Sequence, residues 1–455
     1  MDLFLYNSIS REKEMFIPID SKNIRMYVCG PTVYDSPHIG NARPVIIFDL
    51  LYRLLRYKYG NDKVQYIRNI TDVDDKINKI ALEKYPDIDI NDAISQLTKN
   101  IEYIFKDNAK KLNCLNPTLE PRATDHIRQM IEMIKKLIDS DKAYVSDRHV
   151  LFSINSHKNY GSLSKKSQKD LLAGARVEIA KYKENPLDFV LWKPSQINEP
   201  YWDSPWGKGR PGWHIECSAM SSEYFGSTFD IHGGGIDLIF PHHENEIAQS
   251  CSYHSNKKMA NFFIHNGSLN LEGKKMSKST GNIVSLGDLL GRYSGPVIRL
   301  AMLSTHYRQP IDWTEKNLQQ SKNILKKWSN KLNQISNKDS KESIPEDVYK
   351  SLLDDLNTPQ ALSHMHKYFN NKEYDKLKNS IEIMGFTSHS LTEGNDIKSK
   401  NIQISELEIL TLIDERKDAR TRKDYKKSDE IRNKLEIRGI RLQDEDNETT
   451  WEFIE

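Results

Sequence analysis

A histidine and a glycine stand where a short apolar segment gives way to a helical pattern. Met26-Tyr27-Val28-Cys29 is apolar, Gly30-Pro31-Thr32 interrupts it, and Pro37-His38-Ile39-Gly40-Asn41 opens the helical stretch. A helix N-terminus presents unpaired N–H groups and a partial positive charge, which suits a phosphate. His38 can donate a hydrogen bond to a phosphate oxygen, and Gly40 leaves room for a flat base against the backbone. Taken alone, a histidine here is more often a helix cap or a solvent contact.

A cationic segment lies much further along the chain, at residues 274–282 (KKMSKSTGN). Lys275 and Lys278 stand among Ser, Thr and Gly, a composition typical of a flexible loop. Mobile cations can close over a triphosphate and stabilise the charge that develops during transfer. Because a Lys/Ser run is usually a solvated loop, a catalytic role for these lysines depends on the other motifs.

Thiols, imidazoles and carboxylates in three places could hold a metal ion. The stretch 232–246 contains His242 and Glu246, which are four residues apart and would share one face of a helix. Cys217 lies a short distance before this stretch. Cys29 follows the first predicted strand, and a doubly wound sheet places its site beyond the carboxyl ends of its strands. Two thiolates, an imidazole and a carboxylate form a suitable zinc set.

Spacing alone leaves other ligand sets open. His243 and Glu244 lie in the same stretch, and nothing in their spacing excludes them. A His–Glu pair four residues apart is commonly a surface hydrogen bond. Cysteines as distant in sequence as Cys29 and Cys217 usually have no connection with each other.

Together, these segments resemble the paired signature motifs of class I aminoacyl-tRNA synthetases, usually written HIGH and KMSKS. The second motif is present letter for letter at Lys275–Ser279. The first departs at its last position, where Asn41 keeps a hydrogen-bond donor but cannot become cationic. The wider sequence is similar to the cysteinyl-tRNA synthetases over essentially the whole chain. That similarity is carried by the stretches 5–7, 68–72, 121–124, 185–193, 209–220, 232–249 and 449–451.

The resemblance implies site residues with separate tasks. One Zn²⁺ per chain is expected on four ligands: Cys29, Cys217, His242 and Glu246. The residues expected to line the cysteine pocket are Thr71, Trp213 and Asp237. The residues expected to act in catalysis are His38, Lys275 and Lys278. The residues expected to contact ATP are Gly40, Asn41 and Lys278.

The resemblance also implies the reaction. The carboxylate of L-cysteine attacks the α-phosphate of ATP, which brings Mg²⁺, and gives cysteinyl-adenylate. The 3′-terminal adenosine of tRNA(Cys) then accepts the cysteinyl group. Serine differs from cysteine only by oxygen for sulfur, so pocket shape alone discriminates poorly. Since zinc binds thiolate strongly, we expect it to read the substrate rather than to activate water.

Hydrophobic periodicity predicts an α/β catalytic domain with a Rossmann-like parallel sheet. A strand at 26–29, a helix from about Ile39 to Tyr57 and a strand at 64–68 give the strand–helix–strand order of such a sheet. The resemblance adds an inserted connective segment, a helical bundle and a small C-terminal α+β anticodon-binding domain. The predicted divisions are 1–115 and 212–315 for the two halves of the catalytic domain, 116–211 for the insertion, 316–390 for the bundle, and 391–455 for a linker and the anticodon-binding domain.

Charge and composition limit which partners and which location the protein can be expected to have. The 455 residues include 66 Lys or Arg and 64 Asp or Glu, so a nucleic-acid footprint must be local. Residues 416–441 contain eleven Lys or Arg against five Asp or Glu. Such a stripe suits a phosphate backbone, although a solvated helix face would look the same. The four cysteines are far apart, the start lacks a secretory pattern, and no apolar run reaches the ~18 residues of a membrane span. We expect a cytoplasmic monomer without a membrane partner.

Two other functions fit parts of this pattern. The cysteine ligases of mycothiol synthesis resemble the catalytic core and metal site but join cysteine to an amino-sugar. They lack a full C-terminal tRNA-binding part, which this chain is expected to have. A non-catalytic RNA-binding relative is the other alternative, and the intact Lys275–Ser279 motif with four candidate ligands argues against it.

Overall fold

The chain folds into two compact units, Met1–Gly394 and Asn395–Glu455. The computed structural model describes residues 1–167, 170, 180–196, 199–276, 283–333, 343–387, 406–422, 424–437, 440–445 and 448–453. Within these ranges no helix combines the length and the apolar character that crossing a bilayer requires.

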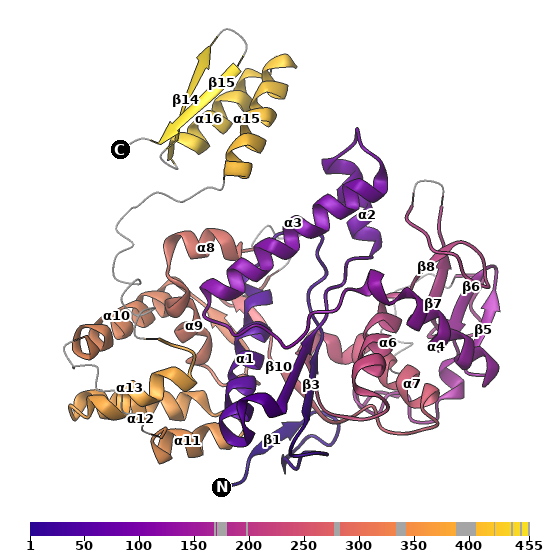
Figure 1. Ribbon diagram of the computed structural model, residues 1–455, viewed down its shortest axis with the longest axis horizontal. Coiled ribbons are helices and arrows are strands. Elements are labelled where there is room, and N and C mark those ends of the chain that lie inside the picture. Colours follow the sequence, from indigo (N-terminus) through magenta and orange to yellow (C-terminus); the bar gives the residue numbers. More distant parts are fainter. Residues whose placement is uncertain are drawn as a thin grey trace. The chain divides into compact units, whose positions relative to one another are not determined.

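Four parallel strands form the centre of the first unit, in the order β10-β9-β3-β4 (Figure 1). Their bounds are Ile24–Val28 for β3, Val64–Arg68 for β4, Phe229–Gly235 for β9 and Ala260–Asn266 for β10. The strands are buried over nearly their whole length, because helices cover the faces of a parallel sheet. The predicted α/β class with a parallel sheet is confirmed.

Helix α1, Ile39–Tyr59, connects β3 to β4 and carries the first motif at its N-terminus. Its apolar side chains at Ile46, Leu50 and Leu54 are fully buried against the sheet. The helix ends at Gly60, whose φ of 118° few other residues adopt. The predicted helix from about Ile39 to Tyr57 is therefore confirmed, with one half-turn more at its end.

A second sheet lies between β4 and β9 in the sequence and is antiparallel, in the order β5-β6-β7-β8. Its strands are Ala143–Ser146, His149–Phe152, Phe189–Pro194 and Gly209–Pro211. The helices of this part of the chain are α2 (Asp75–Lys84), α3 (Ile90–Lys111), α4 (Ile127–Asp139) and α6 (Trp213–Phe225). Aromatic and aliphatic side chains of α4, α6 and this sheet share one core, so α6 is held between the two sheets.

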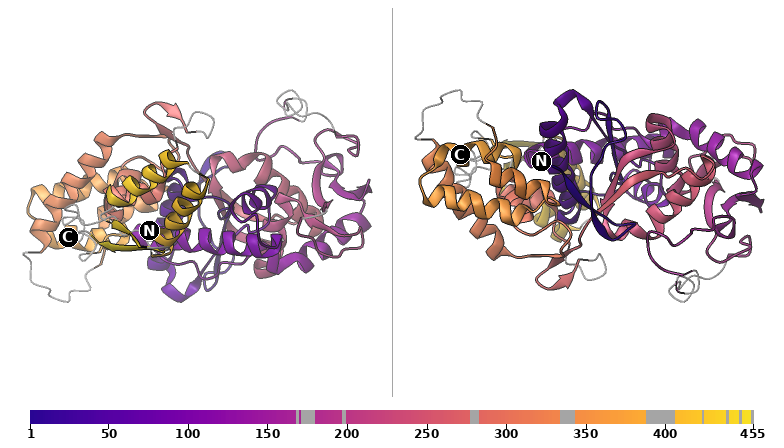
Figure 2. Two further views of the ribbon diagram at one scale, coloured as in Figure 1. Left: turned by 90° about the horizontal axis from the view of Figure 1, so that it is seen from above. Right: turned by 90° about the horizontal axis from the view of Figure 1, so that it is seen from below.

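The rest of the first unit is mostly helical. It contains α7 (Glu244–Tyr253), α8 (Leu286–Arg292), α9 (Gly295–Leu303), α10 (Glu315–Leu332), α11 (Glu346–Leu353), α12 (Thr358–Asn370) and α13 (Tyr374–Ile383). Its short strands are β1 (Phe4–Asn7), β2 (Glu12–Met15), β11 (Leu269–Leu271), β12 (Lys274–Lys275) and β13 (Ile311–Trp313). Helices α10–α13 gather at the end of this unit opposite the β5–β8 sheet (Figures 1 and 2).

The second unit pairs two helices with a hairpin. Its elements are α15 (Glu406–Thr421), α16 (Tyr425–Ile437), β14 (Ile440–Glu445) and β15 (Glu448–Phe453). They enclose their own apolar core, against which Trp451 packs. The sequence pattern predicts one helical stretch from Glu406 to about Glu436, and the structure divides it into α15 and α16. Asp424 accepts the Lys427 N–H at 3.1 Å and so starts a new helix, as an N-cap aspartate does.

Candidate functional site

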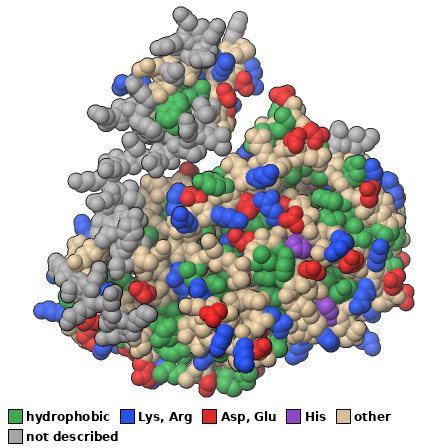
Figure 3. All heavy atoms as spheres, in the orientation of Figure 1, with side chains coloured by type: hydrophobic (Ala, Val, Ile, Leu, Met, Phe, Trp, Pro, Cys, Tyr) green, Lys and Arg blue, Asp and Glu red, His purple; other side chains and the backbone are tan. Residues whose placement is uncertain are grey.

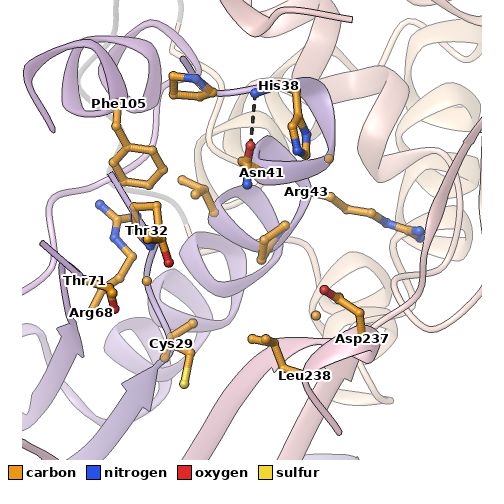
Figure 4. Close-up of a pocket in the computed structure, with 18 of the residues that line it drawn as sticks. Cys29, Thr32, His38, Asn41, Arg43, Arg68, Thr71, Phe105, Asp237 and Leu238 are labelled. Carbon is orange, nitrogen blue, oxygen red and sulfur yellow. Dashed lines mark hydrogen bonds between the residues drawn. The ribbon is translucent and has the colours of Figure 1, made fainter. Parts of the chain in front are cut away.

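A cavity of about 700 Å³ opens at the carboxyl ends of the central strands (Figure 4). Its walls are the turns that follow β3 and β4, the first turns of α1 and α6, and the Gly235–Leu238 turn after β9. A doubly wound sheet binds its ligands at this edge. Residues of the separate sequence motifs therefore meet in one place, although Cys29 and Met276 are 247 residues apart in the chain.

The N-terminus of α1 forms one wall of the cavity. His38 is the N-cap residue, and its backbone N–H donates to Asn41 Oδ1 at 3.0 Å (Figure 4). A Cβ on Gly40 would lie 2.9 Å from the imidazole of His38, so a larger residue would displace that ring. Asn41 thus supports the start of the helix. The N-terminal end of α1 faces the cavity.

The cationic segment begins beside this wall. The methyl of Met276 lies 3.2 Å from the position that a Gly40 Cβ would occupy. Beyond the segment, the Ile39 N–H donates to the Val284 carbonyl at 3.1 Å. The backbone of Lys275 belongs to β12. Its side chain and the whole of Lys278 lie outside the described residues.

Four side chains predicted as metal ligands converge on the floor of the cavity. Cys29 Sγ lies 3.5 Å from Cys217 Sγ and 3.4 Å from Glu246 Oε1. His242 Nε2 lies 3.0 Å from the same Glu246 oxygen. Tetrahedral zinc with bonds of about 2.0–2.3 Å requires donor atoms roughly 3.3–3.8 Å apart. The donor set of two sulfurs, one nitrogen and one oxygen fits zinc in chemistry. The two distances from Cys29 Sγ fall within this range, and the His242–Glu246 distance is slightly shorter.

Neighbouring side chains hold these ligands in place. His232 Nε2 lies 3.0 Å from Glu246 Oε2, the oxygen that the other ligands leave free. His214 Nδ1 lies 2.9 Å from His242 Nδ1, which orients the ring with Nε2 toward the cluster. Metal ligands in proteins are usually supported by such outer partners.

The structure bears on the alternatives that spacing left open. Glu244 is engaged elsewhere, since its carboxylate accepts the N–H groups of Gly161 and Ser164 at 2.9 and 2.7 Å. His243 Nδ1 bonds His265 Nε2 at 2.8 Å, while its Nε2 is 4.0 Å from Glu246 Oε1. A second cluster that includes His243 is also compact, but it offers a single thiol: Cys29, His232, His243 and Glu246. Zinc favours the set with two thiols.

Burial sets the protonation of these groups. It lowers the pKa of His242 well below the usual value, and it lowers the pKa of His214 to about 3. Both imidazoles are consequently neutral, which is the form that binds a metal. Burial raises the pKa of the Cys29 thiol well above its usual value, and the neighbouring Cys217 and Glu246 raise it further. Metal binding must therefore displace protons from the thiols.

The predicted cysteine-pocket residues line the same cavity. The indole of Trp213, the first residue of α6, stacks on the His242 ring with centroids 4.4 Å apart. Thr71 is buried just after β4. Asp237 is exposed and stands on the far side of the cavity from Thr71 (Figure 4). The structure thus brings these three residues and the metal-ligand cluster around one space.

Several residues that shape the cavity through hydrogen bonds were not among the predicted site residues. Arg43, one turn along α1, is buried and donates to the carbonyls of Gly267 and Tyr307 at 2.8 and 3.2 Å. Burial lowers the pKa of Arg43 to about 10. Asn69 and His232 are likewise buried and polar. Arg43 could have been noticed in the sequence, because it is a charged residue among the apolar positions of the predicted helix. No periodicity marks Asn69, whereas His232 opens the stretch of candidate ligands at residues 232–246.

The chain matches known proteins over its whole length. The family model described as the class I (C) tRNA synthetase catalytic domain matches residues 15–323. A cysteine–tRNA ligase of Pelagibacter ubique is 50% identical, with 99% of each chain covered. One from Afipia carboxidovorans is 48% identical, with 100% of each covered. The chain belongs to the cysteine–tRNA ligase family of class I aminoacyl-tRNA synthetases.

A comparison with solved structures shows which known fold this chain shares. A methionyl-tRNA synthetase of Mycobacterium tuberculosis, in complex with methionyl-adenylate, superposes with a TM-score of 0.57 at 14% identity. The match covers 80% of this chain and 89% of that one. At this identity it supports a class I fold with a parallel catalytic sheet and a helical region after it. The resemblance that the sequence motifs indicated is confirmed.

Proposed function

We propose that this chain activates L-cysteine with ATP to form cysteinyl-adenylate and transfers the cysteinyl group to the 3′-terminal adenosine of tRNA(Cys). The observation that carries this proposal is the Cys29–Cys217–His242–Glu246 cluster, which lies on the floor of a cavity whose wall is the N-terminus of α1. Thiol-binding and phosphate-binding groups stand around one space, as joining cysteine to ATP requires.

ATP is assigned to the α1 side of the cavity. The positive end of the α1 dipole faces the phosphates, and His38 donates to a phosphate oxygen. Gly40 leaves space for the base, and Asn41 holds the turn that shapes this wall. Lys275 and Lys278 supply positive charge from the segment 274–282 as negative charge shifts toward the leaving pyrophosphate. Mg²⁺ is assigned to ATP itself.

Cysteine is assigned to the floor. Cys29, Cys217, His242 and Glu246 would hold one Zn²⁺, which when bound favours thiolate sulfur over a hydroxyl oxygen and so separates cysteine from serine. The Trp213 ring, stacked on His242, closes the apolar side of this pocket. Thr71 and Asp237 supply polar groups for the amino-acid end. With both substrates held in line, positioning and charge stabilisation account for most of the first step.

The test compares cysteine with serine in ATP–pyrophosphate exchange, with zinc-loaded and with chelator-treated protein. We expect the preference for cysteine to collapse when the metal is removed, because the remaining pocket sees two side chains of similar shape. A preference that survives removal would overturn the metal-based account. Exchange with cysteine but transfer to an amino-sugar rather than to tRNA would overturn the assignment of the second substrate.

The proposal also assigns the parts of the chain outside the catalytic site. We assign residues 116–211 to an inserted connective segment, 316–390 to a helical bundle, and 391–455 to a linker and an anticodon-binding domain. The acidic and basic side chains are interspersed on the face of the first unit in Figure 3. The local excess of Lys and Arg at residues 416–441 therefore favours the second unit as an electrostatic contact for tRNA. We assign the protein to the cytoplasm as a monomer.

A further inference from the structure

Asn69 lies between the metal-ligand cluster and the cysteine pocket. It follows β4, is 1% exposed and lines the cavity. Its Oδ1 accepts the Gly30 N–H at 2.9 Å and lies 3.6 Å from Cys217 Sγ. Its Nδ2 donates to Thr71 Oγ1 at 3.2 Å. One buried amide thus contacts a predicted metal ligand on one side and a predicted substrate-pocket hydroxyl on the other.

The backbone fixes which way this amide faces. The Gly30 N–H can only donate, so the amide oxygen of Asn69 must face it and the amide nitrogen must face Thr71. An amide nitrogen can only donate in turn, so Thr71 Oγ1 is the acceptor of that bond. The hydroxyl proton of Thr71 therefore points away from Asn69.

Backbone hydrogen bonds hold the chain at Thr71. Its N–H donates to the Pro31 carbonyl at 3.1 Å, and its carbonyl accepts the Val33 N–H at 3.1 Å. A Cβ on Gly30 would lie 1.7 Å from the Asn69 carbonyl, so the turns after β3 and β4 are in close contact. With this backbone held, the orientation of the Thr71 hydroxyl is set by its side-chain partners. It accepts from the Asn69 amide on one side and donates to the buried Glu216 carboxyl on the other.

We propose that Asn69 is a positioning residue for the substrate cysteine, because it holds the Thr71 hydroxyl in the orientation that the amino-acid end of the substrate meets. The inference rests on the proposed function, which places Thr71 in the cysteine pocket. Among the described residues, the hydrogen-bond partners of Asn69 are Gly30, Cys217 and Thr71, none of which is assigned to ATP. Its contribution accordingly belongs to the KM for cysteine and not to the KM for ATP.

The first test changes one atom of this network in the full-length, zinc-loaded protein. Asn69→Asp keeps an oxygen toward Gly30 but replaces the nitrogen donor with an acceptor, so the Thr71 hydroxyl turns to donate to it. We expect the KM for cysteine in pyrophosphate exchange to rise by about tenfold, the effect of one misdirected hydrogen bond. The KM for ATP and the zinc content stay unchanged. Asn113→Asp is the matched control, since Asn113 donates to the Gly385 carbonyl at 2.9 Å, outside the cavity.

A double-mutant cycle with Thr71→Val separates positioning from general damage. If Asn69 acts through Thr71, the double variant has the same KM for cysteine as Thr71→Val alone. Additive effects, or a loss of zinc in Asn69→Asp, overturn the inference. The inference is also overturned if Thr71→Val raises the KM for cysteine and Asn69→Asp does not. An unchanged KM in Thr71→Val overturns the proposed cysteine pocket instead. If Asn69→Asp does not fold, Asn69→Ala takes its place in the same cycle, because a methyl group cannot donate to Thr71.

Discussion

Cys217 offers the sharpest single-residue test of the metal site. Its sulfur is buried at 3.5 Å from Cys29, and a serine oxygen there would be a far weaker zinc ligand. We expect Cys217→Ser to lose bound zinc, measured by atomic absorption, from about one ion per chain. Cysteine-dependent pyrophosphate exchange should fall by more than about 100-fold, beyond the effect of losing an outer partner.

Cys251→Ser is the matched control for that change. Cys251 is a half-buried thiol on α7 and belongs to neither compact cluster of candidate ligands among the described residues. We expect it to keep both zinc and exchange. A Cys217→Ser protein that retained one zinc with full exchange would remove Cys217 from the site and leave the cluster containing His243 as the alternative.

Individual side chains also make stability depend on pH, and His265 is a clear case. Its ring lies between Ser8 Oγ and His243 Nδ1, each at 2.8 Å, and burial lowers its pKa to about 3. Between pH 6.5 and 3 the unfolded chain binds a proton that the folded chain does not, so stability rises with pH in this window. From pH 7 to pH 5 this one histidine should cost about 2 kcal/mol of unfolding free energy.

Denaturant unfolding at pH 7 and pH 5 measures that loss in the wild type and in His265→Asn. The variant is less stable at pH 7 but lacks the titrating group, so its loss between the two pH values should be smaller by about 2 kcal/mol. Equal losses in the two proteins would show that the ring is protonated in the folded state.

Some site residues could be predicted from the sequence and others could not, depending on whether they belong to a local pattern. His242 and Glu246 could be paired from their spacing, since four residues bring two side chains onto one helical face. Cys29 and Cys217 are far apart in the chain. The expected place of Cys29 at the end of a strand made it a candidate ligand, and the family resemblance singled out the four-ligand set. Asn69 escaped because an amide has no periodic signature, and its task depends on two turns that meet only in the folded chain.

At the scale of elements, a buried ion pair connects α1 to the helical part of the first unit. Arg299 of α9 and Asp49 of α1 form this pair, and both are almost completely buried. Arg299 Nε also donates to the Met384 carbonyl, just after α13, at 2.7 Å. Arg299 therefore connects α1, α9 and the end of α13, and α1 is the helix whose N-terminus carries His38.

Arg299→Met should destabilise the protein by about 3 kcal/mol. It removes the fully buried cation that pairs with Asp49, which keeps Arg53 and the Leu115 N–H, and it removes the donor to the Met384 carbonyl. Lys350→Met is the matched control, since Lys350 pairs with Glu346 on an exposed helix face and should contribute less than about 0.5 kcal/mol. Urea unfolding monitored by circular dichroism gives both values. A loss below 1 kcal/mol for Arg299→Met would mean that Arg53, 2.9 Å from Asp49, compensates alone.

The sequence predicted elements better where a single periodicity ran uninterrupted. Helix α1 shows an apolar stripe bounded by a turn and a glycine, and its predicted span was nearly right. The helical stretch from Glu406 was wrong in its continuity, because Asp424 breaks it through a local hydrogen bond that periodicity does not register. The buried tie between Asp49 and Arg299 joins residues 250 positions apart, and no pattern within either helix predicts it.

At the scale of the whole molecule, the two units have separate cores, and every described residue that lines the cavity belongs to the first. A protein ending at Gly394 should therefore keep cysteine-dependent pyrophosphate exchange with unchanged KM values for cysteine and ATP. Its KM for tRNA should rise by about tenfold or more, because the basic segment at 416–441 is lost together with its phosphate contacts.

A full-length variant separates charge from the mere presence of the second unit. Lys427 and Lys434 are exposed on α16, and replacing both with Glu should raise the KM for tRNA and flatten its dependence on salt, while exchange is untouched. Aminoacylation measured at several salt concentrations gives both quantities. If the truncated protein charges tRNA with an unchanged KM, the second unit does not bind tRNA, and the first unit must supply all of the recognition. If truncation abolishes exchange, the two units are not independent, and the catalytic site needs the C-terminal part in order to form.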